Sequence, residues 1–135
     1  MKNLKWVLVA LVGIAMMSCK NEPEFQLSDL QGKWLEDGTE HYLAFLTDKA
    51  DKEDYMWGYE YDLAQDVTEE DVMADEHGNG WFMYRLDKAE LLEIHKLNQG
   101  WADVPKVYTV TVLTDKKLEY HLKDYKNEKV SCTKQ

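Results

Sequence analysis

The sequence predicts an all-β domain, namely an antiparallel up-and-down eight-stranded β-barrel with short helical turns. After Phe25, hydrophobic residues recur at every second position in short segments, which is typical of strands that bury one face. Turn-rich stretches separate these segments, and no segment has the spacing of a long helix. Short connections favour pairing between sequential strands, and closure would remove exposed sheet edges. A two-sheet sandwich is the main alternative.

Two helical turns and a series of strands are expected in order. A capping-box sequence at residues 28–31 predicts one turn that begins at Ser28 and ends at Gly32. A second turn is expected at residues 68–74, where Thr68 is the N-cap and acids follow it. The strands are expected at residues 32–35, 41–47, 55–62, 80–86, 91–97, 106–113, 117–123 and 129–133.

The acidic segment at residues 62–79 is long for a connection in a compact barrel. Two interpretations remain open for it. It is either a lid over the mouth of the barrel or a long solvated hairpin loop.

The first residues have the layout of a bacterial lipoprotein signal. Lys2 and Lys5 precede an uncharged apolar run that is too short to span a bilayer, and small Ser18 precedes Cys19. We therefore expect residues 1–18 to be a signal peptide and Cys19 to be the lipid-attachment site. More than one acyl chain makes such an anchor stable.

Three parts follow from this interpretation. Residues 1–18 are the signal, residues 19–27 are a lipidated polar tether, and residues 28–135 are one barrel domain. Lys20 follows the anchor cysteine, which is compatible with a place in the cell envelope at the outer membrane. The membrane, reached through Cys19, is therefore an expected partner.

Charge and cysteine content limit the function further. The chain of 135 residues has a formal charge of −10, which argues against nucleic acid as a partner. Its two cysteines are Cys19 and Cys132. If Cys19 carries lipid, Cys132 has no intramolecular partner, so the domain must be stable without a disulfide.

The start of the first strand carries a family resemblance. A capped turn leads into Gly32-Lys33-Trp34, which resembles the Gly-x-Trp start of lipocalin-like barrels. Together with the lipoprotein signal, residues 104–120 look like the closing hairpin of lipocalin-like lipoproteins of Bacteroides-type bacteria. The resemblance covers roughly residues 28–134. It implies a barrel with Trp34 at its base and a lumen for a small, often apolar ligand.

One feature departs from the family. Many lipocalins place a late arginine across the Gly-x-Trp tryptophan, where the cation stacks on the ring. The single arginine here is Arg85, in the middle of the chain. Lys129 or Lys134 could take its place, although lysine stacks less well than a guanidinium.

Aromatic residues form the predicted ligand site. Alternation puts four rings of residues 55–61 on one face of the third strand, and Trp101 lies in a later loop at the expected rim. The candidate ligand-binding residues are Trp34, Tyr55, Trp57, Tyr59, Tyr61, Trp81, Tyr84 and Trp101. Two alternatives stay open: the rings only fill the barrel, or the stripe faces outward and docks a partner.

The sequence predicts no enzyme, no cofactor and no metal site. Ser28 and Ser131 are not in a nucleophile pattern, and Cys132 has the setting of a small buried hydrophobe. The histidines lack the spacing of a zinc site, and the acids at residues 48–54 lack the order of a calcium loop. Only a convergence of His95 with His121 across strands would favour catalysis.

The predicted function is therefore ligand binding by a lipid-anchored envelope lipoprotein. Its barrel would hold a small apolar, aromatic or sugar-like molecule. The alternative is a non-catalytic envelope scaffold that docks a partner protein or glycan through acidic loops or the aromatic stripe.

Overall fold

The computed structural model describes residues 23–97 and 100–135, without the side chain of Leu97. The predicted signal peptide at residues 1–18, the anchor Cys19 and the first part of the tether lie outside these ranges.

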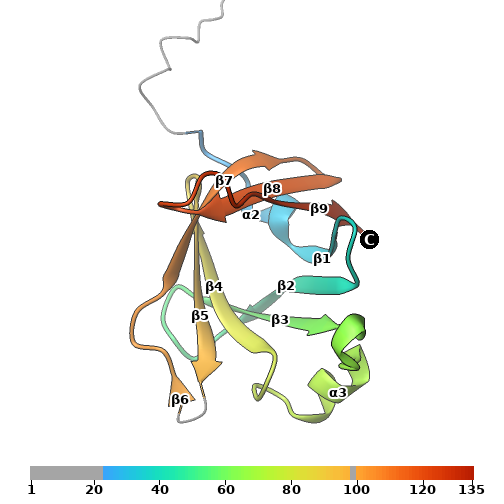
Figure 1. The fold of residues 1–135 in the computed structure, drawn as a ribbon. Helices are drawn as coiled ribbons and strands as arrows, with labels where there is room; N and C mark the ends of the chain where they lie inside the picture. Colours follow the sequence, from blue (N-terminus) through green and yellow to red (C-terminus); the bar gives the residue numbers. More distant parts are fainter. Residues whose placement is uncertain (1–22, 98–99) are drawn as a thin grey trace, which may run out of the picture.

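The described chain forms one closed antiparallel sheet (Figure 1). Its strands are β1 (Gly32–Glu36), β2 (His41–Lys49), β3 (Met56–Asp62), β4 (Trp81–Asp87), β5 (Glu90–Leu97), β6 (Gly100–Trp101), β7 (Lys106–Leu113), β8 (Lys117–Leu122) and β9 (Val130–Lys134). Sequential strands pair, β9 returns to β1, and β4 pairs with β5, so eight strands close the ring. The short β6 pairs with the end of β5 and is not part of the ring. The predicted up-and-down barrel is confirmed, and the two-sheet sandwich is wrong.

The inside of the barrel holds one hydrophobic core. Opposed residues of antiparallel strands share a face, so the pairs Leu43 with Trp34 and Phe45 with Gly58 face inward together. The barrel core consists of Leu30, Trp34, Leu43, Phe45, Phe82, Tyr84, Leu91, Val110, Leu113, Leu118, Tyr120 and Cys132. Its members come from α2 and from every barrel strand except β3, which contributes the partly buried Met56.

A short helix, α2 (Leu27–Leu30), closes one end of the barrel, which we call the closed end. Figure 1 shows α2 within the ring of strands. The fully buried Trp34 donates from Nε1 to the carbonyl of Leu30 at 2.7 Å, and Lys134 Nζ lies 5.0 Å from the centre of the Trp34 ring. Lys134 also donates to the carbonyl of Asp29. Of the two lysines predicted to lie over Trp34, it is therefore Lys134 that does so.

The predicted start of this helical turn at Ser28 is wrong. Gln26 is the N-cap, and it makes no side-chain cap bond, so Ser28 lies inside the helix. The helix begins earlier because the backbone N–H of Gln31 bonds to the carbonyl of Leu27, which turns Leu30 into the barrel core.

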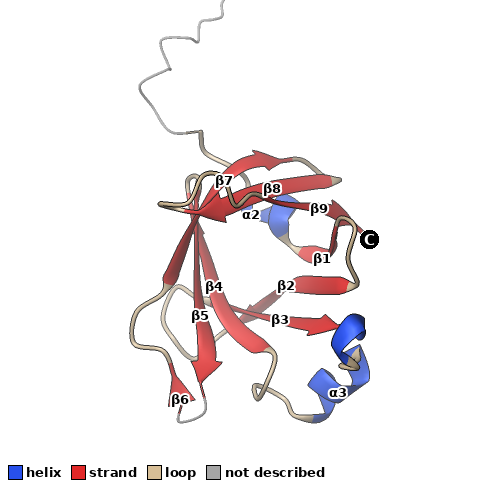
Figure 2. Ribbon diagram, in the orientation of Figure 1, coloured by secondary structure: helices blue, strands red, loops and turns tan. Residues whose placement is uncertain are grey.

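The second helix, α3 (Glu69–Ala74), lies outside the barrel against β3 (Figure 2). It begins at the predicted N-cap Thr68, which forms a capping box with Asp71 because each side chain accepts from the other's backbone N–H. A 3-10 turn, η3 (Leu63–Gln65), connects β3 to it. Val72 is buried and its carbonyl accepts from Trp81 Nε1 at 3.0 Å. The segment at 62–79 therefore packs on the outer face through Val72, while most of its residues stay exposed, as expected for a solvated connection between two strands.

Gly58 sets the packing at the middle of β3. A Cβ atom there would lie 2.5 Å from the ring of Phe82 and 2.8 Å from the carbonyl oxygen of Ala44. We therefore expect Gly58→Ala to destabilise the fold by about 1–3 kcal/mol, because the core must move to admit the methyl group. Urea unfolding of the chain from Lys20 onward, which contains every described residue, measures this change.

The matched control is a second substitution in the same contact. Phe82→Leu removes the ring that the new methyl group would strike, so Gly58→Ala should cost less in the Phe82→Leu background than in the natural chain. Equal costs in the two backgrounds would contradict the assignment of Gly58 to the inner face.

Candidate functional site

The aromatic stripe faces outward, which corrects its predicted place as the wall of a lumen. Tyr59 pairs with Ala44 and Trp81, and Trp57 pairs with Met83, all on the outer face of the sheet. The outer aromatic layer contains Tyr55, Trp57, Tyr59, Tyr61 and Trp81, and these residues are only 4–8% exposed. Val72 of α3 packs on this layer, and Trp101 lies 5.6 Å from Trp57 between ring centres.

Two of the predicted residues, Trp34 and Tyr84, do face the interior. There they pack as core: Trp34 is bonded at the closed end, and Tyr84 donates to the carbonyl of Leu46 at 2.6 Å. The rings of Phe45 and Tyr84 meet edge to face at 5.0 Å. The interior from the closed end to the middle of the barrel is thus filled by the chain's own side chains.

The opposite end, where β1 ends and β2 begins, holds a row of charged side chains. Glu36, His41, Glu60, His95 and Glu93 alternate as acid and imidazole along it, and we call them the carboxylate–imidazole row. Its bonds are Glu36 Oε1 to His41 Nδ1 at 3.1 Å, His41 Nε2 to Glu60 Oε1 at 2.8 Å, Glu60 Oε2 to His95 Nδ1 at 3.4 Å, and His95 Nε2 to Glu93 Oε1 at 2.7 Å. We call this end of the barrel the open end.

Strand register explains why these five side chains meet. Glu60 lies opposite Leu43, and His95 lies opposite Phe82, so both point to the inner face. The His95 ring also stacks on Phe82 at 5.1 Å between centres. Glu93 lies opposite the core residue Tyr84 and is only 4% exposed. The row therefore crosses from β1 through β2 and β3 to β5 inside the barrel.

The row shifts the pKa values of its members strongly. Hydrogen bonds to Glu60 and then to Glu36 raise the pKa of His41 to about 9, although burial opposes this. Burial would lower the pKa of His95, but its bonds to Glu60 and Glu93 outweigh burial and raise it to about 9. Burial likewise opposes ionisation of Glu60, yet the two imidazoles lower its pKa to about 2. Both imidazoles are therefore cationic at neutral pH.

Two tyrosines lie near the Glu93 end of the row. Tyr108 and Tyr120 lie on the inner face of β7 and β8, with ring centres 5.1 Å apart in an edge-to-face arrangement. Burial, followed by the charge of Glu93, raises the pKa of each hydroxyl. Within the described chain neither hydroxyl has a hydrogen-bond partner, and neither oxygen is sealed from solvent.

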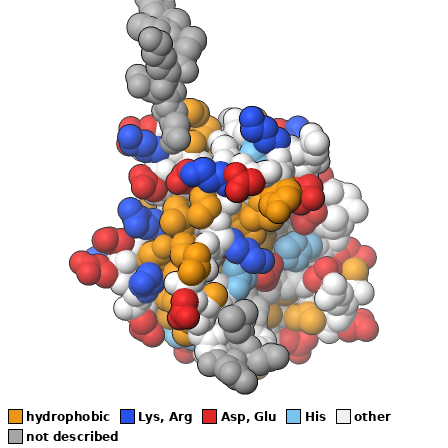
Figure 3. Space-filling model, turned by 60° about the vertical axis from the view of Figure 1, so that its left-hand side comes forward, with side chains coloured by type: hydrophobic (Ala, Val, Ile, Leu, Met, Phe, Trp, Pro, Cys, Tyr) orange, Lys and Arg blue, Asp and Glu red, His pale blue; other side chains and the backbone are white. Residues whose placement is uncertain are grey.

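A pocket of about 300 Å³ leads to the row from outside. It lies between the start of β2, the end of β3 and the turn η3, and is lined by His41, Glu60, Tyr61, Asp62, Gln65 and Val67. This volume is at the lower end of the range for small-molecule sites. On the face drawn in Figure 3, histidine side chains reach the surface among hydrophobic and charged neighbours.

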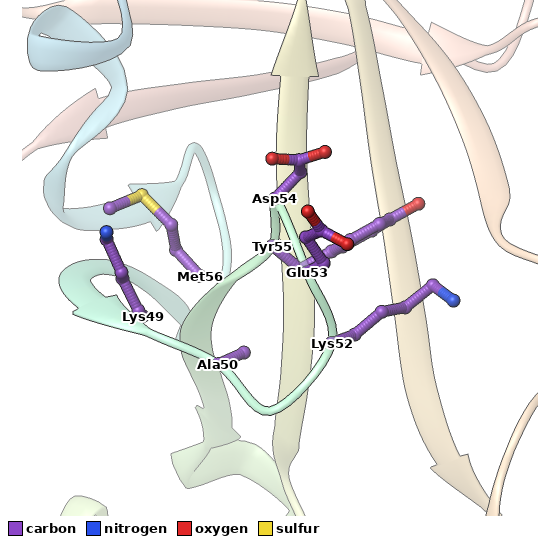
Figure 4. A pocket seen from close by; sticks show the side chains of 7 residues that line it. All are labelled: Lys49, Ala50, Lys52, Glu53, Asp54, Tyr55 and Met56. Carbon is purple, nitrogen blue, oxygen red and sulfur yellow. The ribbon is translucent and has the colours of Figure 1, made fainter.

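The other pockets offer weaker chemistry. The loop between β2 and β3 lines a pocket of about 420 Å³ at the closed end. Figure 4 shows its side chains diverging, with Lys49 and Met56 on one side and Lys52, Glu53 and Tyr55 on the other. A pocket of about 380 Å³ beside Trp101 has Met83 and Ile94 on its lining. Neither brings buried polar groups together.

The remaining predicted candidates are separated from the row. His121 pairs with Thr109 on the outer side of the barrel, and its Nδ1 lies 2.7 Å from the carbonyl of Leu122, so it does not converge with the inward-facing His95. Cys132 is fully buried in the core, and burial raises its pKa to about 12. Among the described residues, no cluster of three or more His, Cys, Asp or Glu side chains is arranged to hold a metal ion.

Sequence reasoning missed Glu36, His41, Glu60 and Glu93. These residues lie on four strands, and only the register brings them together. The available signal was a charged residue at an alternate position next to core residues, as Glu60 is in residues 55–61.

Comparisons with protein-family models, with curated proteins and with solved structures gave no match to this chain. Within the residues that the structure describes, no helix has the length and apolar character needed to cross a membrane.

The pKa shifts predict how stability changes with pH. The raised values of His41 and His95 stabilise the fold fully below pH 6.5, and this contribution is lost as pH rises through about 9. The lowered value of Glu60 stabilises the fold above pH 4.5, and this is lost as pH falls toward about 2. Burial raises the pKa of Glu93, so its contribution to stability also falls as pH rises above 4.5. We therefore expect greatest stability near pH 4.5 and a loss on the order of 2 kcal/mol by pH 9.5, measured by urea unfolding.

Two variants test the source of this loss. His41→Gln combined with His95→Gln should flatten the alkaline side of the profile, whereas His121→Gln should keep it. A profile of unchanged shape in the double variant would show that other groups cause the loss.

Proposed function

We propose that this protein binds a small molecule at the open end of its barrel. The observation that carries the proposal is the carboxylate–imidazole row, which is held inside the barrel next to unpaired tyrosine hydroxyls. Ionisable groups are costly to bury, and strongly shifted pKa values gather at functional sites. A convergent set of polar groups with an adjoining pocket is the usual form of a ligand site.

Binding is favoured over catalysis by the state of the imidazoles. Both nitrogens of His41 and both nitrogens of His95 lie within hydrogen-bond distance of carboxylates. No imidazole nitrogen of the row is therefore left to accept a proton from a substrate or to bind a metal. The groups that remain for a ligand are carboxylate oxygens and the two tyrosine hydroxyls.

The filled interior changes the kind of ligand that fits. An apolar molecule deep in a lumen would have to displace Phe45, Phe82 or Tyr84, each of which is fully buried. A polar or aromatic molecule at the rim needs no such displacement. We therefore favour the aromatic or sugar-like class over a lipid.

A lipid anchor at Cys19 would suit this site. The described chain begins at Pro23, and the backbone N–H of Phe25 donates to the carbonyl of Lys88, in the β4–β5 turn at the closed end. An anchor shortly before Pro23 would hold the closed end toward a membrane and leave the open end accessible. This supports the proposal of an envelope lipoprotein, with the outer membrane as its location.

The alternative of a docking scaffold gains no support from the aromatic stripe. Tyr59 donates to Glu69 of α3, which also pairs with Lys33 at 2.9 Å, so the stripe is covered by the chain itself. Docking through the acidic loops remains a prediction.

A ligand screen tests the proposed site. The chain from Lys20 onward is titrated with fatty acids, bile acids, flavins and oligosaccharides, and backbone amide shifts are followed by NMR. We expect saturable shifts at His41, Glu60, His95 and Tyr108 for one class. Glu60→Gln should weaken that binding at least tenfold, because the amide has no charge and can accept from only one of the two imidazoles.

The control for this screen is Glu70→Gln, which changes an exposed acid of α3. It should leave the affinity unchanged. Shifts confined to the pocket beside Trp101 would move the site to the outer face and contradict the proposal.

The anchor has its own test. In a bacterial host fed with labelled palmitate, we expect the natural chain to carry the label and to fractionate with membranes. Cys19→Ala should lose both properties, whereas Cys132→Ala should keep both. An unlabelled, released natural chain would contradict the lipoprotein assignment.

A further inference from the structure

The row is unbalanced in charge. Glu36, Glu60 and Glu93 alternate with two imidazoles, so each end of the row is a carboxylate. When both imidazoles are cationic, the row has one net negative charge if all three carboxylates are ionised, and it is neutral if Glu93 is protonated. A buried charge of this kind is unfavourable unless an opposite charge offsets it.

The imbalance falls on Glu93. Glu93 is 4% exposed, and burial raises its pKa while His95 opposes the shift. Lys106 lies opposite Glu93 in the register, and its charge also favours the ionised acid. The Lys106 side chain is exposed, however, and it forms no ion pair with any described residue. Among the described residues, Lys106 therefore acts on Glu93 only through its charge, and burial favours the protonated acid unless a further cation comes beside it.

The atoms of the row that are free to bond a ligand are carboxylate oxygens. Both oxygens of Glu60 are used by imidazoles, but the second oxygens of Glu36 and Glu93 have no partner among the described residues. These oxygens accept hydrogen bonds and do not donate when the acids are ionised. A complementary ligand must bring N–H or O–H donors.

The tyrosines add a second, independent preference. Tyr120 is 6% exposed and Tyr108 is partly buried, and both lie on the inner face of β7 and β8, beyond the Glu93 end of the row. Their hydroxyls have no partner within the described chain. Aromatic faces attract cations, and phenolic oxygens accept hydrogen bonds from them.

We propose that the open end binds a small organic cation, whose ammonium group donates to Glu93 and to the hydroxyls of Tyr108 and Tyr120. This assignment rests on the proposed function and names its ligand class. The cation balances the third carboxylate, and the tyrosine rings cover its carbon chain.

Two matched sets of probes test the class with the chain from Lys20 onward. The aliphatic set is 1,4-diaminobutane, 1,4-butanediol and succinate, and the aromatic set is 2-phenylethylamine, 2-phenylethanol and phenylacetate. Members of a set have similar size and differ in charge. By calorimetry and amide NMR, we expect saturable binding of at least one amine, with shifts at Glu93, Tyr108 and Tyr120, and no binding of its neutral or anionic counterparts.

Four variants distinguish amine binding at this site from nonspecific attraction of amines to an acidic protein. Glu93→Gln and Tyr120→Phe should each weaken amine binding at least tenfold. Glu53→Gln, in the loop at the closed end, and Tyr42→Phe, on the outer face, should not. If Glu93→Gln does not fold, Tyr120→Phe and the location of the shifts in the natural chain decide the question. Amine shifts spread over the acidic surface, unchanged in Tyr120→Phe, would overturn the proposal.

The outcomes also distinguish the two proposals. If a sugar or another neutral compound shifts the open end and neither amine does, the cation assignment fails and the binding site stands. If no probe or screened compound shifts the open end, both fail.

Discussion

Closure of the sheet is the constraint on which the rest of this structure depends. Once β9 pairs with β1 and β4 with β5, every strand has an inner and an outer face, and the inner space is limited. Trp34, Phe45, Phe82 and Tyr84 fill that space so completely that β3 contributes Gly58 beside the Phe82 ring. The large aromatic residues of β3 therefore cannot point inward. They need a second layer, and the segment with α3 provides it through Val72.

The two ends of the barrel differ because different groups close them. At one end, Trp34 bonds to the backbone of α2 and Lys134 lies on its ring, which leaves an apolar and well-packed closure. At the other end, the row of acids and imidazoles occupies the equivalent inner positions. Such a row is an inefficient way to stabilise a barrel, because hydrophobic residues of similar volume commonly do as well or better. Its presence at the end that adjoins a pocket is the reason to assign function there.

Electrostatics inside the row links stability to binding. Glu60 is ionised because it accepts from two cationic imidazoles, and these are cationic because each lies between two acids. The groups thus hold one another in the charged state. Glu93 is the most deeply buried carboxylate of the row, and burial raises its pKa although His95 and Lys106 oppose the shift. A ligand that compensates Glu93 would stabilise the whole row.

The sequence by itself determined the strands and the N-cap at Thr68, because alternation and capping are local patterns that the backbone obeys directly. The place of Trp34 at the closed end was expected only from the resemblance of Gly32-Lys33-Trp34 to the start of lipocalin-like barrels. The sequence also identified the aromatic run at residues 55–61, but not its direction. A period of two defines two faces and does not say which is inside, and the more hydrophobic face was the natural choice for the interior. Only the tertiary structure decided that this face turns outward, because Phe82 already fills the inner space at Gly58. Only the register across β1, β2, β3 and β5 brought Glu36, His41, Glu60, His95 and Glu93 together, since such distant positions meet through strand pairing alone.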